Sequence, residues 1–303
     1  MKKILVIGSL NMDFAIQVEN APQKGETVLA NSMTLIPGGK GANQAYAAAK
    51  LGGRVTMLGA VGEDSYGKNL RDSLASAGVD ISRLKTVPGV STGIALVMVD
   101  QSGDNRIVVI PGANHCVDIP YIQRNRDIIE ASDIVVCQLE IPLETVIYAA
   151  KTAKECGKMV ILDPAPARED IPQELYAYVD LIKPNEHELM TLVGGEGNLQ
   201  EAAASLHGKG IGSVLVTMGE KGSRLYCPDG VEVEKSAIPV NSVDTTGAGD
   251  SYTAALAVAL AEEAGMEKAM ELASLVGAIT TTTMGAQTSF PSREEVEAWS
   301  RRS

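Results

Sequence analysis

The stretch Ile4-Leu5-Val6-Ile7-Gly8-Ser9-Leu10-Asn11-Met12-Asp13 begins with four aliphatic residues and then becomes polar. A short apolar run that is rich in β-branched residues and ends at a glycine is typical of a strand buried on both faces of a sheet. Similar runs recur along the chain at residues 55–58, 134–136, 160–162, 181–182 and 214–216. The sequence therefore predicts a series of buried strands.

Amphipathic segments separate these runs. Helical patterns cover residues 42–51, 66–77, 143–155 and 199–207, and longer alanine-rich helical patterns cover 247–263 and 267–283. Gly52, Gly53 and Gly157 follow helical segments, where C-terminal glycines belong. Strands that alternate with helices predict the α/β class, with a mostly parallel central sheet and helices on both faces in a three-layer sandwich.

Two segments, at about 14–37 and 92–110, show strand-like alternation without helices. Residues 94–99 and 106–110 read as a hairpin, and we expect both segments to pair into a small β-sheet. One interpretation is a lid inserted over the edge of the main sheet, and the other is an ordinary extra sheet packed on the core. The organisation expected is a single domain over 1–303 that carries this sheet.

Charge and composition exclude several classes of function. The chain has 303 residues, with 38 acidic and 26 basic side chains, a net charge of −12 and only 4% aromatic residues. Such a chain is not expected to bind nucleic acid, either along the phosphate backbone or by stacking on bases. No apolar run approaches the length of a membrane span or of a signal-peptide core, and the four cysteines are scattered. We expect a cytoplasmic protein without membrane contact.

The strongest local motif is Asp244-Thr245-Thr246-Gly247-Ala248-Gly249-Asp250, at the start of a predicted long helix. Small residues let a ligand approach the backbone closely, and N–H groups at a helix start attract anions. Asp250 would lie in the first turn, beside that anion site. A base beside an anion site suits phosphoryl transfer to a hydroxyl group. The alternative is a glycine-rich turn in which Asp250 only interacts with the helix dipole.

Two other motifs predict contacts to a polyhydroxylated ligand. Gly38-Gly39-Lys40-Gly41-Ala42-Asn43-Gln44 opens a helix without the spacing of a P-loop, and its Lys40 and Asn43 would project from the helix start. Asp13 follows the first strand, where open α/β sheets bind ligands, and a carboxylate there can accept bonds from two vicinal hydroxyls. A helix cap or a turn is the alternative for each motif.

A fourth motif is Lys183-Pro184-Asn185-Glu186-His187-Glu188. Asn185 and Glu188 are three residues apart, so they share a face of a helix. A carbonyl and a carboxylate together suit hydrated Mg²⁺ near phosphates. Asn185 as helix cap and Glu188 as the second half of a capping box is the alternative, and both descriptions can hold at once.

Taken together, the motifs resemble the ribokinase family of carbohydrate kinases along nearly the whole chain. The matching strings, in the order of the family, are Gly8–Asp13, Gly25-Glu26-Thr27, Pro37–Ala45, Pro111–Asn114, Gln138-Leu139-Glu140, Asp163–Pro166, Lys183–Glu186, Asp244–Asp250 and Gly285-Ala286-Gln287. The resemblance implies a sheet-and-helix core with a β-strand lid, often shared between two subunits of a homodimer.

The resemblance also implies roles for individual residues. The sugar-binding positions of the family match Asn11, Asp13, Gly39, Lys40, Asn43 and Glu140. Asp250 matches the catalytic base, and the anion hole matches Gly247, Ala248 and Gly249. The ATP-binding positions match Asn185, Thr217, Gly219, Glu220, Gly222, Gly249 and Ser274, the last standing where the family often has His or Asn near adenine. Glu188 matches an indirect Mg²⁺ position, and the site for an activating K⁺ matches Asp244, Thr246, Thr280, Gly285 and Ser289.

The function that the resemblance implies is transfer of the γ-phosphoryl group of ATP to O5 of D-ribose, giving ribose 5-phosphate and ADP. Deoxyribose, fructose or a nucleoside such as adenosine remain alternative acceptors. A sugar-binding sensor without activity is an alternative of a different class, although a sensor has no need of a base such as Asp250. A dinucleotide-dependent oxidoreductase is disfavoured because the turn after the first strand lacks the Gly-x-Gly-x-x-Gly pattern.

Overall fold

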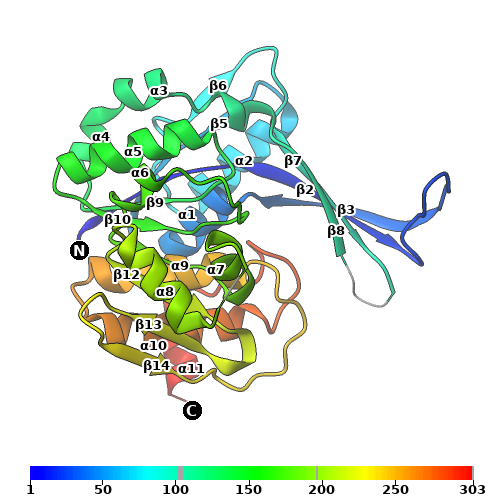
Figure 1. Cartoon of the computed structure of the whole chain (residues 1–303). Coiled ribbons are helices and arrows are strands. Elements are labelled where there is room, and N and C mark those ends of the chain that lie inside the picture. The colour runs from blue at the N-terminus through cyan, green and yellow to red at the C-terminus, as the bar shows by residue number, and fades with distance from the viewer. Residues whose placement is uncertain (102–104, 196, 302–303) are drawn as a thin grey trace.

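The computed structural model of the chain describes residues 1–101, 105–195 and 197–301. Within these residues the largest sheet has eight strands, in the order β14-β13-β12-β11-β10-β9-β1-β4 (Figure 1). In that order the strands are Glu232–Lys235, Ser223–Tyr226, Ser213–Thr217, Leu181–Ile182, Met159–Leu162, Ile134–Cys137, Lys3–Ile7 and Arg54–Leu58. Neighbours from β12 to β4 are parallel, and β13 and β14 add an antiparallel edge. The mostly parallel sheet is confirmed.

Side chains of β1 alternate between two buried layers. Ile4 and Val6 join one apolar cluster, and Leu5 and Ile7 join the other. The helices that contribute to the first cluster are α1 Lys40–Lys50, α2 Ser65–Ser76, α9 Ala248–Ala261, α10 Met266–Thr280 and α11 Arg293–Ser300. Those that contribute to the second are α3 Ile119–Arg124, α4 Arg126–Ala131, α5 Leu143–Glu155, α6 Gln173–Tyr176, α7 Glu186–Leu192 and α8 Leu199–Gly208. The strands are therefore apolar on both faces, and the predicted three-layer sandwich is confirmed.

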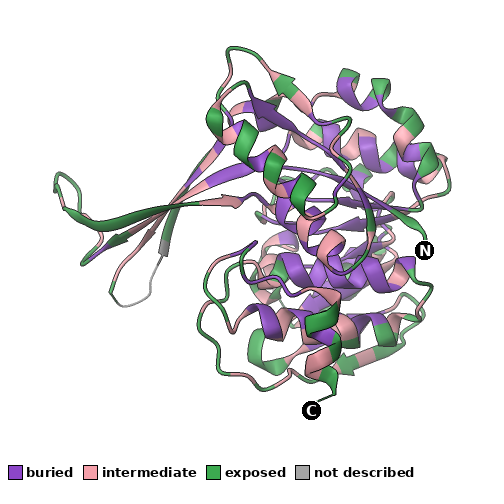
Figure 2. Ribbon diagram, turned by 180° about the vertical axis from the view of Figure 1, so that it is seen from behind, coloured by how far each residue is buried: buried purple, intermediate pink, exposed green. Residues whose placement is uncertain are grey.

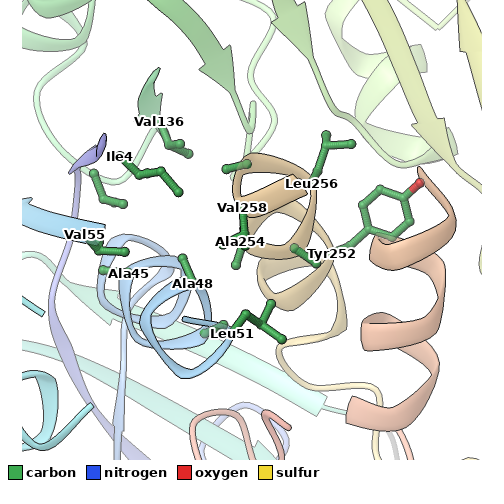
Figure 3. Packing of buried hydrophobic residues seen from close by; sticks show 14 of the residues in the cluster. Ile4, Ala45, Ala48, Leu51, Val55, Val136, Tyr252, Ala254, Leu256 and Val258 are labelled. Atoms are coloured by element: carbon green, nitrogen blue, oxygen red, sulfur yellow. The ribbon is translucent and has the colours of Figure 1, made fainter. Parts of the chain in front are cut away.

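Helices α1 and α9 pack against the same face of the sheet, and their packing positions the site. Figure 3 shows Ala45 and Ala48 of α1 near Ala254 and Val258 of α9, beneath strand residues. Small side chains at such a contact let two helices approach closely. The first turns of both helices therefore lie together at the carboxyl ends of the strands.

A second sheet, with the order β3-β2-β7-β8, projects from the body as a lid (Figure 1). Its strands are β3 Ala30–Gly38, β2 Asn11–Val18, β7 Gly93–Val99 and β8 Asn105–Ile110. The hairpin is confirmed, because β7 and β8 pair antiparallel, and β2 joins the two segments by pairing parallel to β7. Asn11 and Asp13 lie in β2, so neither caps a helix nor forms a turn.

A small parallel pair, β5 Ala60–Gly62 with β6 Lys85–Val87, was not expected from the sequence. Short 3-10 turns, η1 Gly112–Cys116 and η2 Gly219–Lys221, complete the elements. Figure 2 shows that burial is concentrated in the body, whereas the far end of the lid is largely exposed. Among the helices of the described residues, none combines the length and apolar character needed to cross a bilayer.

Candidate active site

Asp250 lies in the first turn of α9. The helix begins after Gly247, which has a φ of 78°, a value that favours glycine. Asn43 Nδ2 donates to Asp250 Oδ2 over 2.9 Å, and Gln44 Nε2 donates to Oδ1 over 3.0 Å. The carboxyl group is 7% exposed, at the edge of a cleft. The structure thus joins the motif that starts α9 to the motif that starts α1.

The charges around Asp250 act against one another. Burial raises the pKa of Asp250, the cation of Lys40 lowers it, and the carboxylate of Asp163 raises it; the net pKa is above the ordinary value. Burial lowers the pKa of Lys40, but the carboxylates of Asp250, Asp163 and Glu140 outweigh it, and the net pKa is above the ordinary value. A buried carboxyl group with a raised pKa has the character of a general base.

Two of the predicted sugar residues, Asn11 and Lys40, meet a third, Glu140, in the loop after β9. Its Oε2 accepts hydrogen bonds from Ser9 Oγ at 2.5 Å, from the backbone N–H of Lys40 at 3.2 Å and from Asn11 Nδ2 at 3.5 Å. The loop after β1, the start of β2 and the start of α1 therefore meet at one carboxylate. The result is a polar cluster with donors and acceptors that could bond to several hydroxyl groups.

Two glycines allow the chain to fold this closely. A Cβ on Gly38 would lie 2.1 Å from Asp13 Oδ2. Gly39 has a φ of 88°, and a Cβ there would lie 2.6 Å from the backbone nitrogen of Asn11. A side chain at Gly39 would meet the backbone of Leu10 and Asn11 and displace β2 from the start of α1, whereas one at Gly38 would displace the side chain of Asp13.

Asp13 is the second unusual carboxyl group. Burial, reinforced by the carboxylates of Glu140 and Asp250 and opposed by Lys40, raises its pKa to about 7. The charges of Asp13 and Asp250 therefore interact electrostatically. Asp13 belongs to the lid strand β2, and Asp250 belongs to the first turn of α9.

Asn114 was missed by sequence reasoning, although it lies in one of the matching strings. It is buried in η1, and its Nδ2 donates to Asn11 Oδ1 over 2.8 Å. Its other bonds go to the backbone of Leu10, with Nδ2 donating to the carbonyl and Oδ1 accepting from the N–H. Because Asn114 occupies Asn11 Oδ1, the amide nitrogen of Asn11 is directed toward Glu140.

A cleft of about 770 Å³ leads from Lys40 and Asp250 along the carboxyl ends of the strands. It is lined by the predicted anion-hole residues Gly247, Ala248 and Gly249. The predicted ATP and Mg²⁺ positions also line it, namely Asn185, Glu188, Thr217, Gly219, Glu220, Gly222 and Ser274. The cleft therefore unites two sets of residues that the sequence left separate.

Asn185 caps α7, and Glu188 completes the capping box. Asn185 Oδ1 accepts from the N–H of Glu188, and Glu188 Oε2 accepts from the N–H of Asn185, both over 2.8 Å. Asn185 also forms a parallel bridge with Thr217. The capping alternative is thus confirmed, and the same two side chains still line the cleft.

The predicted cation residues come from the segment before α9 (Asp244 and Thr246), from the end of α10 (Thr280) and from the segment after α10 (Gly285 and Ser289). Asp244 Oδ1 accepts from Thr246 N and Oγ1 at 2.9 and 2.6 Å, and Oδ2 accepts from Gly285 N at 2.8 Å. The hydroxyl of Thr280 bonds to Ser251 Oγ and to a carbonyl of its own helix, and that of Ser289 donates to a neighbouring carbonyl. The set is made of oxygen donors, which are the ligands that hard cations take.

Asp163 and Lys183 also line the cleft and were assigned no role from the sequence. They follow β10 and β11 directly, and the carboxyl ends of neighbouring parallel strands are where ligand-binding residues gather. That rule applies to both positions, and it is the sequence signal that could have found them.

Comparison with known proteins places these features in a family. Residues 1–293 match the model of the pfkB family carbohydrate kinases. The chain is 41% identical to a ribokinase from Bacillus subtilis over 98% of this chain and 99% of that protein, and 38% identical to a deoxyribokinase from Salmonella typhi over 96% of each. The structure of Arabidopsis thaliana ribokinase complexed with ribose and ATP is similar with a TM-score of 0.91 and 36% identity, over 98% of each chain. The chain belongs to the pfkB family of carbohydrate kinases and is of the ribokinase type.

Proposed function

We propose that the chain transfers the γ-phosphoryl group of ATP to O5 of D-ribose, giving ribose 5-phosphate and ADP. The observation that carries the proposal is the position of Asp250, whose buried carboxyl group lies between the polar cluster around Glu140 and the cleft that Gly247 and Gly249 line. A ribokinase 41% identical over almost its whole length and a relative whose structure contains ribose and ATP support the substrates.

In the mechanism that we propose, Asp250 accepts the proton of the attacking hydroxyl. The sugar is held by Asn11, Asp13, Gly39, Lys40, Asn43 and Glu140. The hydrogen bonds from Asn43 and Gln44 orient the carboxyl group before the sugar arrives. Backbone N–H groups of residues 247–249 stabilise the charge of the transferring phosphoryl group.

The cleft is where we place ATP, along Thr217, Gly219, Glu220 and Gly222, with Ser274 toward the base and Asn185 toward the phosphates. Mg²⁺ supplies charge neutralisation of the phosphate oxygens in phosphoryl transfer. Glu188 is the carboxylate that lines the cleft beside Asn185, so it fits an indirect position through water.

We place an activating K⁺ among Asp244, Thr246, Thr280, Gly285 and Ser289. Hydrogen bonds from Thr246 and Gly285 outweigh partial burial and hold the pKa of Asp244 below its ordinary value, so the carboxyl group is anionic. The segment Asp244-Thr245-Thr246 directly precedes Gly247 in the chain. A cation there would fix the anion hole from behind.

A second candidate acceptor is 2-deoxyribose, because a deoxyribokinase is 38% identical over nearly the whole chain. Fructose and adenosine remain further candidates within the same mechanism. The cytoplasmic location stays a prediction from the sequence.

We further propose a homodimer formed through the lid. Ile107 and Val109 are 55% and 43% exposed on the face of this sheet that carries Asp13, and Leu35 and Val108 are exposed on the opposite face. Apolar side chains gathered on a projecting sheet mark an interaction surface. A second copy of the lid, with the same apolar character, is a suitable partner.

The test is ADP release from ATP and Mg²⁺ with ribose, 2-deoxyribose, fructose, adenosine or no sugar, each with and without K⁺. We expect the highest kcat/KM with ribose, and a higher rate with K⁺. Highest turnover with another acceptor would replace the substrate. A folded chain that binds ribose without any turnover would instead be a sensor.

Asp250→Asn tests the base in the same assay. We expect kcat to fall by about 10²–10⁴, the usual contribution of a general base, while ribose still binds. Asp72→Asn, at an exposed i,i+4 pair on α2, is the control and should keep wild-type turnover. Near-normal turnover by Asp250→Asn would rule out this assignment.

A further inference from the structure

A buried ion pair lies beside the anion loop, the name we use for the predicted anion hole of residues 247–249. Lys183 Nζ is 3.4 Å from Asp163 Oδ2, and both side chains are only 3% exposed. Lys183 Nζ also donates to the carbonyl oxygen of Gly249 over 3.3 Å. The pair therefore ties the ends of two neighbouring strands to the first turn of α9.

The same pair is joined to Asp250 by a second route. Gln44 Nε2 donates to Asp163 Oδ2 over 2.8 Å and to Asp250 Oδ1 over 3.0 Å. The side-chain oxygen Oε1 of Gln44 accepts a hydrogen bond from Gln138 Nε2, which fixes the direction of the Gln44 amide. One amide group thus bridges the carboxylate of the pair and the carboxylate of the proposed base.

This arrangement does not favour stability. Asp163 Oδ1 is buried and has no hydrogen-bond partner within the described residues. Removing two charges from water costs free energy that the ion-pair contact at 3.4 Å and the hydrogen bonds from Gln44 to Asp163 and from Lys183 to Gly249 return only in part, and the unmade bond of Asp163 Oδ1 adds to the cost. Two apolar side chains would fill this position at a lower cost in folding free energy. We therefore expect the pair to serve the active site.

We propose that the Asp163–Lys183 ion pair is a positioning unit of the active site, which holds the anion loop through Gly249 and sets the charge around Asp250. The inference rests on the proposed function, because it concerns the same base. Lys183 fixes the Gly249 carbonyl and so directs the adjoining N–H groups into the cleft. Asp163 gives Gln44 its acceptor and balances the lysine charge.

The charged groups around Asp250 come from several elements. Lys40 of α1 and Lys183 after β11 are cationic, whereas Asp13 of β2, Asp163 after β10 and the more distant Glu140 are acidic. Asp250 must be ionised to accept a proton, so activity is lost as the pH falls through its pKa. A change that removes a nearby negative charge moves this acid limb to lower pH, and one that removes a positive charge moves it to higher pH.

The test measures kcat and kcat/KM against pH for three variants, with the sugar that the wild-type chain phosphorylates. In Asp163→Asn we expect the acid limb of kcat, measured at saturating sugar so that ionisation of Asp13 does not limit binding, to move down by about one pH unit. In Lys183→Met it should move up, and kcat on the high-pH plateau should fall about tenfold because the Gly249 carbonyl loses its donor. Asp163→Asn/Lys183→Met should return the limb close to its wild-type position but keep the low plateau.

Lys154→Met is the matched control. Lys154 pairs with Asp180 just before β11, at the opposite end of the strand from Lys183, and this pair is about one third exposed. Lys154→Met removes the same type of charge as Lys183→Met and should leave the acid limb of the pH profile in place. If Lys183→Met does not fold because a buried charge is left unpaired, Asp163→Asn and the neutral double variant carry the test.

The proposal would be overturned if the acid limb of Asp163→Asn stayed in place or moved to higher pH. It would also be overturned if the double variant had the wild-type kcat on the high-pH plateau. These outcomes would leave the proposed kinase function in place. Absence of sugar-dependent turnover in the wild-type chain would remove the kinase function first, and the positioning role with it.

Discussion

Asp13 shows how a single residue of this site is placed at a cost to stability. Its pKa of about 7 lies above the ordinary value for a carboxyl group, mainly because of burial. The native state then binds more protons than the unfolded state between these two values. Stability contributed by the protonated form is therefore lost as the pH rises from about 4 to about 7. The ionised side chain is retained because it can accept hydrogen bonds from two hydroxyl groups.

Sugar binding should consequently depend on pH. If only the ionised form of Asp13 binds, ribose affinity at pH 6 should be about tenfold lower than at pH 8. Calorimetric titration with ribose in the absence of ATP measures this directly. Asp13→Asn is the control: it should bind ribose weakly without this pH dependence and should be more stable than the wild-type chain at pH 8. Equal affinity at both pH values in the wild-type chain would contradict the role of Asp13.

At the scale of elements, the start of α1 depends on backbone freedom as much as on side chains. Gly39 caps the helix with a φ of 88°, against the backbone of β2. Gly78 has a φ of 89°, yet a Cβ there meets nothing within 4 Å. Both glycines have a positive φ that disfavours other residues, and they differ in the space around them.

Gly39→Ala and Gly78→Ala therefore separate strain from close contact. We expect Gly78→Ala to cost about 1 kcal/mol of unfolding free energy, from strain alone. Gly39→Ala should cost about 1–3 kcal/mol more because β2 must move away from α1. It should also raise the KM for ribose. Urea unfolding and steady-state kinetics measure the two effects, and equal unfolding free energies for the two variants would show that the site relaxes without cost.

The lid is the element whose exposed apolar surface needs a partner. Register pairing places Asp13, Ala95 and Val109 opposite one another, so they share a face, and Ile107 lies two residues further along β8 on that face. Val109 and Ile107 are 43% and 55% exposed. The face that carries Asp13 is therefore also apolar toward the tip of the lid.

Ile107→Lys should weaken the proposed dimer, because a charge would enter an apolar contact. Light scattering coupled to size-exclusion chromatography should show a shift from dimer to monomer. Val231→Lys, at a similarly exposed apolar residue between β13 and β14, is the control and should keep the oligomeric state. A monomeric wild-type chain would exclude the lid-mediated dimer.

At the scale of the whole molecule, the site is assembled from segments far apart in the chain. Asp250 is 207 residues from Asn43, and Gln44 is 119 residues from Asp163. The main sheet brings them together because each segment follows the carboxyl end of a strand or the start of a helix at the same edge. Unfolding of any part of the body would therefore separate the residues of the site. Ligands that bind the site should accordingly stabilise the whole domain.

Ribose at about 100 times its Kd should raise the unfolding free energy by about 2.7 kcal/mol, provided that only the native state binds it. Urea unfolding with and without ribose at pH 8 measures this. Asp13→Asn should show little of the effect at the same ribose concentration. An unfolding curve of the wild-type chain that ribose does not move would place the sugar site elsewhere.

The sequence by itself determined the features that arise from local physics. The apolar runs and the helical periodicity reveal the alternation of strands and helices, because the period of burial is set by backbone geometry. The glycine-rich start of α9 and the capping box of Asn185 and Glu188 also act within a few residues. The order of the matching strings then indicated the family.

Only the tertiary structure decided which of these features meet. The parallel pairing of β2 with β7, the place of Asn114 behind Asn11 and the Asp163–Lys183 pair join segments with no local relation. The raised pKa values of Asp13 and Asp250 could not be predicted from the sequence, because they depend on burial and on the balance between neighbouring carboxylates, which raise them, and Lys40, which lowers them. Desolvation and charge interactions depend on distances in space, and those distances exist only once the whole chain has folded.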